Sequence, residues 1–312
     1  MQVIGKLNTY QNYLVEKFGE RVQKVPLNSG FSCPNLDGTL SNIGCSYCRN
    51  DAFSPFYCDA TQPVVQQLRN GMQFFGKKYG VSKFFAYFQS FSGTNASIDE
   101  LYKVFSSVID VPGVVGLVIA TRPDCIDSEK LHMLKELSAK KYISIEIGIE
   151  STNDNVLKRI NRGHTYKQSA DAVRKIAEFQ LSVGGHIILG LPGESSTEHI
   201  HAAQILSELP LSSIKIHHLQ ILRGTKMADE FAKNPEDFKL FSLAEHIERL
   251  ADFVENLRSS IAIDRFNTRS PLSLLISPRW NSEKNVRNCN INSLLEDSLI
   301  KRGTWQGKMF KK

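Results

Sequence analysis

The feature of the sequence that most constrains the fold is a recurring pattern of short apolar runs, each followed by an amphipathic stretch. The runs are rich in β-branched and aromatic residues, as buried strands are. They are KVPLN (24–28), KFFAYFQ (83–89), VVGLVIAT (114–121), ISIEIGI (143–149), GGHIILGL (184–191) and SIKIHHLQIL (213–222). The stretches between them, such as 127–140 and 166–181, keep a helical period. This α/β alternation predicts parallel strands covered by helices, in a full or partial barrel or a doubly wound sheet.

Beyond residue 225 the alternation fades. A helix is predicted from Leu243 to about residue 259, and the remainder, including IDRFNTRSPLSLLISPRW, is predicted to be irregular. From Arg258 to the end there are eleven Lys and Arg but four Asp and Glu, a net charge of +7 in a chain of +6. We therefore expect a core domain over 1–225 and a basic helical extension over 226–312. A basic segment is typical of proteins that bind a polyanionic partner, although a basic surface that contacts only solvent has the same composition.

Several predicted strands end in polar, Gly-rich segments, namely QSFSGTNA, ATRPD, GIES and GLPGE. The carboxyl ends of parallel strands lie at one rim, which is where barrels and doubly wound sheets place their chemistry. The segment GFSCPNLDGTLSNIGCSYCRN (30–50) follows the first strand and carries Cys33, Cys45 and Cys48 at the same rim. The sequence therefore predicts a functional site there.

The three cysteines admit four interpretations. They are ordinary thiols, a C-x-x-C redox pair, a zinc site completed by Cys58, or three ligands of an iron–sulfur cluster. A redox pair leaves Cys33 without a role, and a structural zinc site usually stabilises a small segment rather than a large barrel. A cluster with three protein ligands leaves one iron open to a small molecule, which suits a catalytic rim. We expect Cys58, Cys125 and Cys289 not to be ligands.

The composition excludes other classes. No apolar run reaches the length of a membrane span, and the N-terminal residues lack the pattern of a signal peptide. The six cysteines are too unevenly spaced for a disulfide framework. We expect a cytoplasmic protein with no membrane partner.

Taken with the cysteine loop, five later segments resemble one family: ATRPDC, IEIGIES, RINRGH, HIILGLPGE and KIHHLQIL. The chain resembles radical S-adenosylmethionine (SAM) enzymes over about residues 20–225, and among them the group of the Elongator catalytic subunit and its short bacterial relatives. The usual loop of the family is C-x3-C-x2-C. Here the first gap is eleven residues, an expansion typical of the short bacterial group. The resemblance implies a partial (β/α)6 barrel of parallel strands.

The resemblance also implies the cofactors, a [4Fe–4S] cluster and SAM. Cys33, Cys45 and Cys48 would ligate the cluster, whose open iron would bind the amino and carboxylate groups of SAM. Tyr47 matches the family aromatic that flanks the adenine. SGT (92–94) stands where the family has Gly-Gly-Glu, so Thr94 or a backbone carbonyl would contact the methionine amine.

Four further positions carry over from the family. Glu150 would face the ribose, and Arg162 would lie near the SAM carboxylate. His186 replaces a polar residue on the ribose side, and the turn that begins at Gly190 would lie beside the adenine. The family reaction is a one-electron cleavage of SAM to a 5′-deoxyadenosyl radical that abstracts hydrogen from the substrate. No catalytic residue beyond these ligands is assigned.

The resemblance suggests the tRNA wobble uridine as substrate, and one bacterial branch is thought to remove the carboxymethyl part of a carboxymethylaminomethyl-uridine. The expected partners are a tRNA anticodon loop and an electron donor such as a flavodoxin or ferredoxin. Plausible phosphate contacts are Arg265, Arg269, Arg279 and Arg287. No acetyl transfer is expected. The alternatives are radical chemistry on a small molecule or protein side chain, and a zinc-stapled RNA-binding protein.

Overall fold

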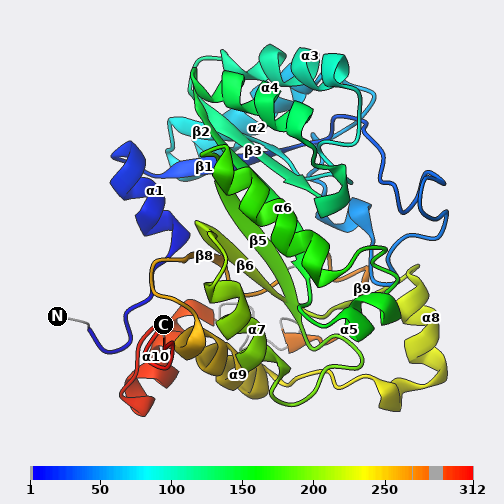
Figure 1. Cartoon of the computed structure of the whole chain (residues 1–312), viewed down its shortest axis with the longest axis vertical. Helices are drawn as coiled ribbons and strands as arrows, with labels where there is room; N and C mark the ends of the chain where they lie inside the picture. Colours follow the sequence, from blue (N-terminus) through cyan, green and yellow to red (C-terminus); the bar gives the residue numbers. More distant parts are fainter. Residues whose placement is uncertain (1–2, 269, 281–290, 312) are drawn as a thin grey trace.

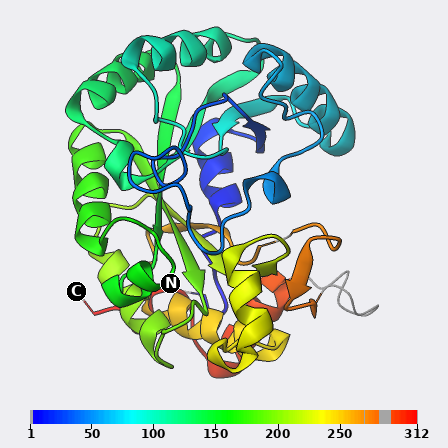
Figure 2. The ribbon, with the colours of Figure 1, turned by 90° about the vertical axis from the view of Figure 1, so that its right-hand side faces the viewer.

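A computed structural model describes residues 3–268, 270–280 and 291–311 of the chain. Seven parallel strands form one curled sheet in the order β1-β2-β3-β4-β5-β6-β8. Helices lie along the outer side of this half-barrel (Figures 1 and 2). The strands are β1 (Val22–Leu27), β2 (Lys83–Phe88), β3 (Val114–Thr121), β4 (Tyr142–Glu150), β5 (Ser182–Leu189), β6 (Ser213–His218) and β8 (Ala262–Arg265).

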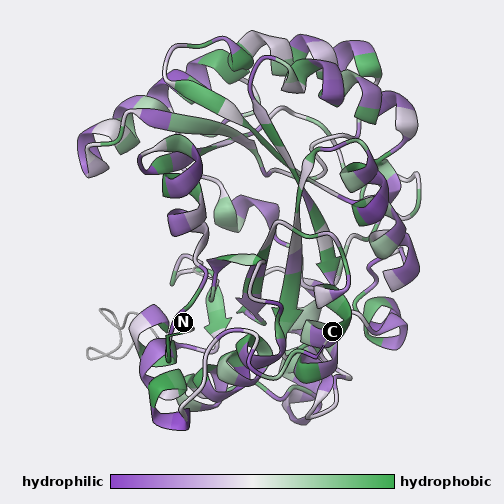
Figure 3. Ribbon diagram, turned by 60° about the vertical axis from the view of Figure 1, so that its left-hand side comes forward, coloured by the Kyte–Doolittle hydropathy of each residue, from purple (hydrophilic) through white to green (hydrophobic). Residues whose placement is uncertain are grey.

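The helices that cover the sheet follow the strands in the chain. They are α2 (Val64–Tyr79), α3 (Ile98–Ile109), α4 (Ser128–Ser138), α6 (Tyr166–Glu178) and α7 (Glu198–Ser207). Two shorter helices, α5 (Asp154–Arg159) and α8 (Lys226–Lys233), lie near the rim of the barrel. The strands are largely hydrophobic, whereas the helices alternate in character along their length (Figure 3). This difference is expected when strands are buried on both faces and helices on one.

Local sequence signals set where several helices begin. Ser97 and Glu100 form a reciprocal capping box at the start of α3, and Thr165 with Gln168 does the same for α6. A third box, Ser242 with Glu245, begins α9 (Leu243–Asn256). Each box pairs two backbone N–H groups that the first helical turn leaves without partners.

The predicted α/β half-barrel is confirmed, but the segment after residue 257 is less irregular than predicted. It contains the seventh sheet strand β8, a short strand β9 (Leu275–Ser277) paired antiparallel with β7 (Ile221–Leu222), and α10 (Ile291–Arg302). The strand β8 has four residues, two of them charged, so it gives no apolar run. The division at residue 225 stays a prediction, and β8 from the second segment pairs with β6 of the first.

The two ends of the chain meet beside the edge strand β8. Thr9, just before α1 (Tyr10–Phe18), forms a parallel bridge with Ile263, and α1 contacts both edge strands β1 and β8. At the other end, α10 packs on α9, where the Arg302 guanidinium pairs with Glu248, with Asp252 at 2.8 Å and with Glu255 at 3.1 Å. The open side of the barrel is thus partly closed by α1. Among the described residues, no helix combines the length and apolarity needed to cross a membrane.

Candidate active site at the carboxyl ends of the strands

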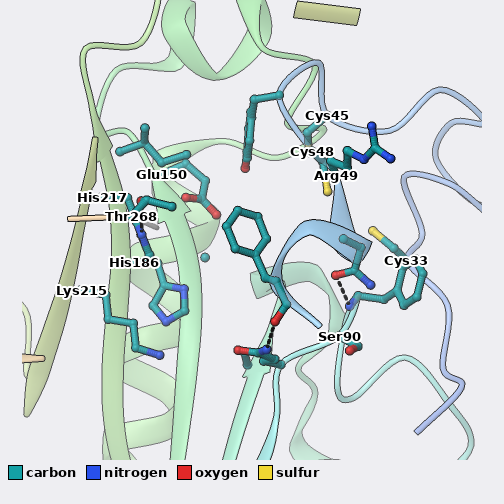
Figure 4. Close-up of a pocket in the computed structure, with 18 of the residues that line it drawn as sticks. Cys33, Cys45, Cys48, Arg49, Ser90, Glu150, His186, Lys215, His217 and Thr268 are labelled. Carbon is teal, nitrogen blue, oxygen red and sulfur yellow. Dashed lines mark hydrogen bonds between the residues drawn. The ribbon is translucent and has the colours of Figure 1, made fainter. Parts of the chain in front are cut away.

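A cavity of about 260 Å³ opens at the carboxyl ends of the parallel strands, and residues on or just after all seven of them line it. Seven of the nine residues expected at the site line this cavity. They are Cys33, Cys45, Cys48, Tyr47, Glu150, Arg162 and His186. Figure 4 places Cys45 and Cys48 on one side and His186, Lys215 and His217 on the other.

The long gap between the first two cysteines is folded into a closed loop. Leu36 N and Asp37 N donate to the Cys33 carbonyl at 2.7 and 3.0 Å, and Gly44 N donates to the Asn35 carbonyl at 2.6 Å. Gly44 has φ +75°, and a Cβ there would lie 2.7 Å from the Leu36 side chain. The eleven residues between Cys33 and Cys45 therefore turn back on themselves and return the chain to the same cavity.

Two side chains donate hydrogen bonds to the Cys45 sulfur. Asn35 Nδ2 lies 3.4 Å and Arg162 Nη1 3.5 Å from Sγ, and both donors are buried. Hydrogen-bond donors directed at sulfur are typical outer partners of metal-ligating cysteines. Burial raises the pKa of Cys33, while the nearby charges of Arg122 and Arg162 oppose the shift.

The Arg162 guanidinium is fixed by the end of β4. Its Nη2 donates to the Gly148 carbonyl at 2.7 Å and lies 3.3 Å from Glu150 Oε1. A Cβ at Gly148 would stand 2.4 Å from Nη2, so this close approach requires glycine. Among the described residues, the Nε of Arg162 is buried without a hydrogen-bond partner. Glu150 has φ +68° and lines the cavity.

His186 reaches the cavity from β5, and its Nε2 is 3.0 Å from Glu146 Oε2. Burial and the charge of Lys215 lower the pKa of His186, although Glu146 opposes the shift. The imidazole is therefore neutral near pH 7. Since its bond with the carboxylate needs a donor, Nε2 carries the proton.

The structure does not bring Thr94 or Gly190 to the cavity. Thr94 is buried, and its hydroxyl bonds Thr121 Oγ1 at 2.6 Å and donates to the Cys125 carbonyl at 2.9 Å. The Thr94 hydroxyl is thus already engaged by these two partners. Gly190 has φ +86° and lies in a turn whose N–H donates to Glu194 Oε2 at 2.8 Å.

Glu194 is a source of pH-dependent stability. Burial raises its pKa to about 8 from the usual 4.5, although the Gly190 N–H opposes the shift, so the carboxyl favours its protonated form when folded. Its contribution to stability is present below pH 4.5 and is lost as the pH rises through about 8. Glu194→Gln keeps an acceptor for Gly190, and we expect its stability relative to wild type to increase across this window. Denaturant unfolding at several pH values measures the difference, and Glu178→Gln on the exposed face of α6 should show no such trend.

A buried ionic network, whose members Glu146 and Lys215 line the cavity, was missing from the sequence prediction. Glu146 accepts from Lys24 Nζ at 2.7 Å and from Lys215 Nζ at 2.6 Å, while Asp264 accepts from Lys24 at 2.6 Å. Lys215 also donates to Tyr87 Oη at 2.7 Å. Charged residues inside otherwise apolar strands, as in ISIEIGI and SIKIHH, were the available signal, because a buried charge requires a partner.

The other cysteines are placed away from the cavity or lie outside the described residues. Cys58 belongs to the main apolar core, where burial raises its pKa to about 11, and Cys125 is also buried. No group of three or more His, Cys, Asp or Glu among the described residues is arranged around a single metal ion. A cubane cluster takes each thiolate on a different iron atom, so its ligands need not surround one ion. Cys289 lies outside the described residues.

The four arginines expected at tRNA phosphates are differently placed. Arg265 lines the cavity, whereas the Arg279 guanidinium donates to the carbonyls of Leu275 and Ile276, both at 3.1 Å. Arg269 and Arg287 lie outside the described residues. Phosphate contact by any of them stays a prediction.

Comparisons with known proteins agree with this architecture. The model of the radical SAM superfamily matches residues 40–206, and that of the radical SAM C-terminal domain matches 211–296. YtqA of Bacillus subtilis is 32% identical over 98% of this chain and 94% of its own. A tRNA uridine(34) acetyltransferase of Methanocaldococcus infernus is 22% identical over 61% of this chain and 34% of its own.

Among solved structures, the Elp3 protein of Methanocaldococcus infernus, lacking its first 46 residues, shares the fold with a TM-score of 0.66 at 17% identity. The match covers 91% of this chain and 64% of the Elp3 chain. Enzymes of the matched family use a [4Fe–4S] cluster and SAM. With a family model over more than half of its length and a relative that matches nearly all of it, the chain belongs to the radical SAM superfamily.

Proposed function

We propose that this radical SAM enzyme binds its cluster through Cys33, Cys45 and Cys48 and modifies the side chain of a tRNA wobble uridine. The observation that carries the cluster assignment is the convergence of the three thiols on one cavity at the carboxyl rim. A second thiol-rich group does not occur in the cavity lining, and Cys58 is held in the apolar core.

The donor set fits such a cluster. Hydrogen bonds from Asn35 and Arg162 to the Cys45 sulfur stabilise negative charge on a ligand, as outer partners of iron–sulfur ligands do. Cys48 lines the cavity rather than the apolar core, and desolvation of its thiol raises its pKa to about 12. When bound, the reduced cluster supplies the electron that cleaves SAM.

Four side chains of the cavity are proposed to hold SAM. Arg162 offers the SAM carboxylate a buried Nε that has no hydrogen-bond partner in the described part of the chain. Glu150 offers an acceptor for the hydroxyls of the SAM ribose. The neutral His186 offers a ring edge on the ribose side. Tyr47 offers an aromatic face for the adenine. Since Thr94 is engaged elsewhere, a backbone carbonyl at the rim is the remaining acceptor for the SAM amino group.

The chain around the cavity is proposed to limit the access of water to the reacting atoms. The cavity is bounded by strand ends on all sides of the half-barrel and by residues of the C-terminal segment, including Arg265 and Thr268. Confinement of this kind protects a reactive species from solvent and fixes the substrate close to it. The electron donor is proposed to be a flavodoxin or ferredoxin, and the compartment the cytoplasm.

The tRNA substrate is supported by two observations. Curated relatives are named tRNA uridine(34) acetyltransferases, and the segment from Arg258 onward carries a net charge of +7. Anticodon loops present unstacked bases that a pocket can accept, and basic segments bind their phosphates. Because the matched part is only 34% of the archaeal acetyltransferase, acetyl transfer is not carried over.

Nucleoside mass spectrometry of total tRNA from cells lacking this protein tests the proposal. We expect one modified wobble uridine to disappear or to be replaced by its precursor. Plasmid-borne wild-type protein and the Cys58→Ala variant should restore the modification, whereas Cys45→Ala should not. Unchanged levels of every modified uridine would eliminate tRNA as the substrate while leaving the enzyme class in place.

A further inference from the structure

Five cationic side chains line the cavity, and four of them are neutralised by carboxylates. The pairs are Arg49 with Asp51, Arg122 with Asp124, Arg162 with Glu150, and Lys215 with Glu146. The fifth is Arg265. Within the described part of the chain, its guanidinium makes no hydrogen bond or ion pair.

The position of Arg265 is set by the sheet. It is the last residue of β8 and lies in register with Lys215 of β6, next to Asp264, whose carboxylate accepts from Lys24 at 2.6 Å. The Lys215 ammonium is already occupied by Tyr87 and Glu146. Arg265 is exposed to the cavity and to solvent, so it is available to a ligand that enters.

The neighbours of Arg265 add polar groups at the same end, and the nearby carboxylates of Asp264 and Glu146 are engaged by Lys24 and Lys215. His217 Nδ1 is bonded to Thr268 Oγ1 at 2.7 Å, and both residues line the cavity. Burial lowers the pKa of His217, and the charges of Arg265 and Lys215 lower it further, so the ring is neutral. His217 and Thr268 lie across the cavity from Cys45 and Cys48 (Figure 4).

We propose that Arg265 binds an oxyanion of the substrate, a carboxylate or a phosphate, at the end of the cavity opposite the cysteines. The planar guanidinium matches both groups in a bidentate arrangement, and an unpaired cation beside a half-buried cavity has the most to gain from one. The proposal rests on the proposed function, and it assigns to Arg265 the role of determining which substrate that enzyme accepts. An anion held at β8 directs the remainder of the substrate toward the thiols of the opposite side.

Binding to anticodon stem–loop RNA tests this inference. One RNA carries a 5-carboxymethyl group on its wobble uridine, and a matched RNA carries the methyl ester, which has a similar shape without the charge. We expect wild-type holoprotein to bind the acid at least about tenfold more tightly than the ester. Arg265→Gln should abolish this difference. Arg174→Gln, the same change on the exposed face of α6, should preserve it.

The outcomes separate the two anion sources. If wild type binds both RNAs equally and Arg265→Gln weakens both about tenfold, the oxyanion is an RNA phosphate. If Arg265→Gln binds both RNAs as wild type does, the inference is wrong.

If wild type binds neither RNA, the tRNA proposal fails and a second measurement decides the inference. Acetate or inorganic phosphate is titrated into oxidised holoprotein with labelled arginine. A saturable shift of the Arg265 Nε–Hε resonance, identified by its loss in Arg265→Gln, supports the site, and an unshifted resonance overturns it.

Discussion

Replacing Cys45 with alanine is expected to yield a colourless protein with little iron and with SAM cleavage at the background level. Cys45 is the buried member of the three thiols, and its sulfur receives the hydrogen bonds of Asn35 and Arg162. Loss of one of the three proposed ligands would leave the cluster with two. Removal of the Cys45 sulfur also takes away a hydrogen-bond acceptor of the Arg162 guanidinium. Iron analysis, visible absorption and 5′-deoxyadenosine formation after reduction measure the three effects.

The matched control for this substitution is Cys58→Ala. Cys58 follows the same loop, but its sulfur lies in the apolar core and does not line the cavity. We expect this variant to keep its iron and its SAM cleavage. Iron retained at the wild-type level in Cys45→Ala would contradict the assignment, whereas iron lost in Cys58→Ala would point to the zinc-type set that includes Cys58.

Replacing Glu146 with glutamine is expected to destabilise the protein by about 3–5 kcal/mol. Glu146 is 2% exposed and accepts from Lys24, Lys215 and His186 at 2.6–3.0 Å. Glutamine keeps the shape of the side chain but removes its charge. The ammonium groups of Lys24 and Lys215 then lose one carboxylate partner each. The change in the free energy of unfolding is measured by denaturant titration, with an unaltered slope as the sign that only stability has changed.

Two variants make this result specific. Glu178→Gln on the exposed face of α6 should stay within about 0.5 kcal/mol of wild type. Adding Lys215→Met to Glu146→Gln should recover part of the loss, because an apolar residue removes the unpaired charge.

The neighbouring lysines hold the pKa of Glu146 well below its usual value, so its stabilisation is present at neutral pH and lost as the pH falls through that lowered pKa. A Glu146→Gln protein as stable as wild type would mean that the network contributes nothing net.

The sheet was largely predictable because its central strands are long apolar runs. The predicted runs 83–89 and 114–121 correspond to β2 and β3 almost residue for residue. β8 was not predictable in this way, since it is short and half charged, and it gains its place from pairing with β6. The paired strand β6 lies far away in the sequence, so no local pattern predicts β8.

The site was predictable where chemistry depends on residue type and spacing, and less so where it depends on side-chain direction. Cys33, Cys45 and Arg162 meet because their loops follow strands that end at the same rim. Thr94 also follows a strand, but its hydroxyl turns to Thr121 instead. The contacts of Lys24 with Asp264 join opposite edges of the sheet, 240 residues apart, and only the closed fold brings them together.

The electron paramagnetic resonance spectrum of the reduced, anaerobically purified protein tests the central claim most directly. Three thiolate ligands, as proposed, would leave one iron available to SAM, so we expect about four irons per chain and a cluster spectrum that shifts when SAM is added. A spectrum that SAM leaves unchanged, or a colourless protein that carries zinc, would contradict the account.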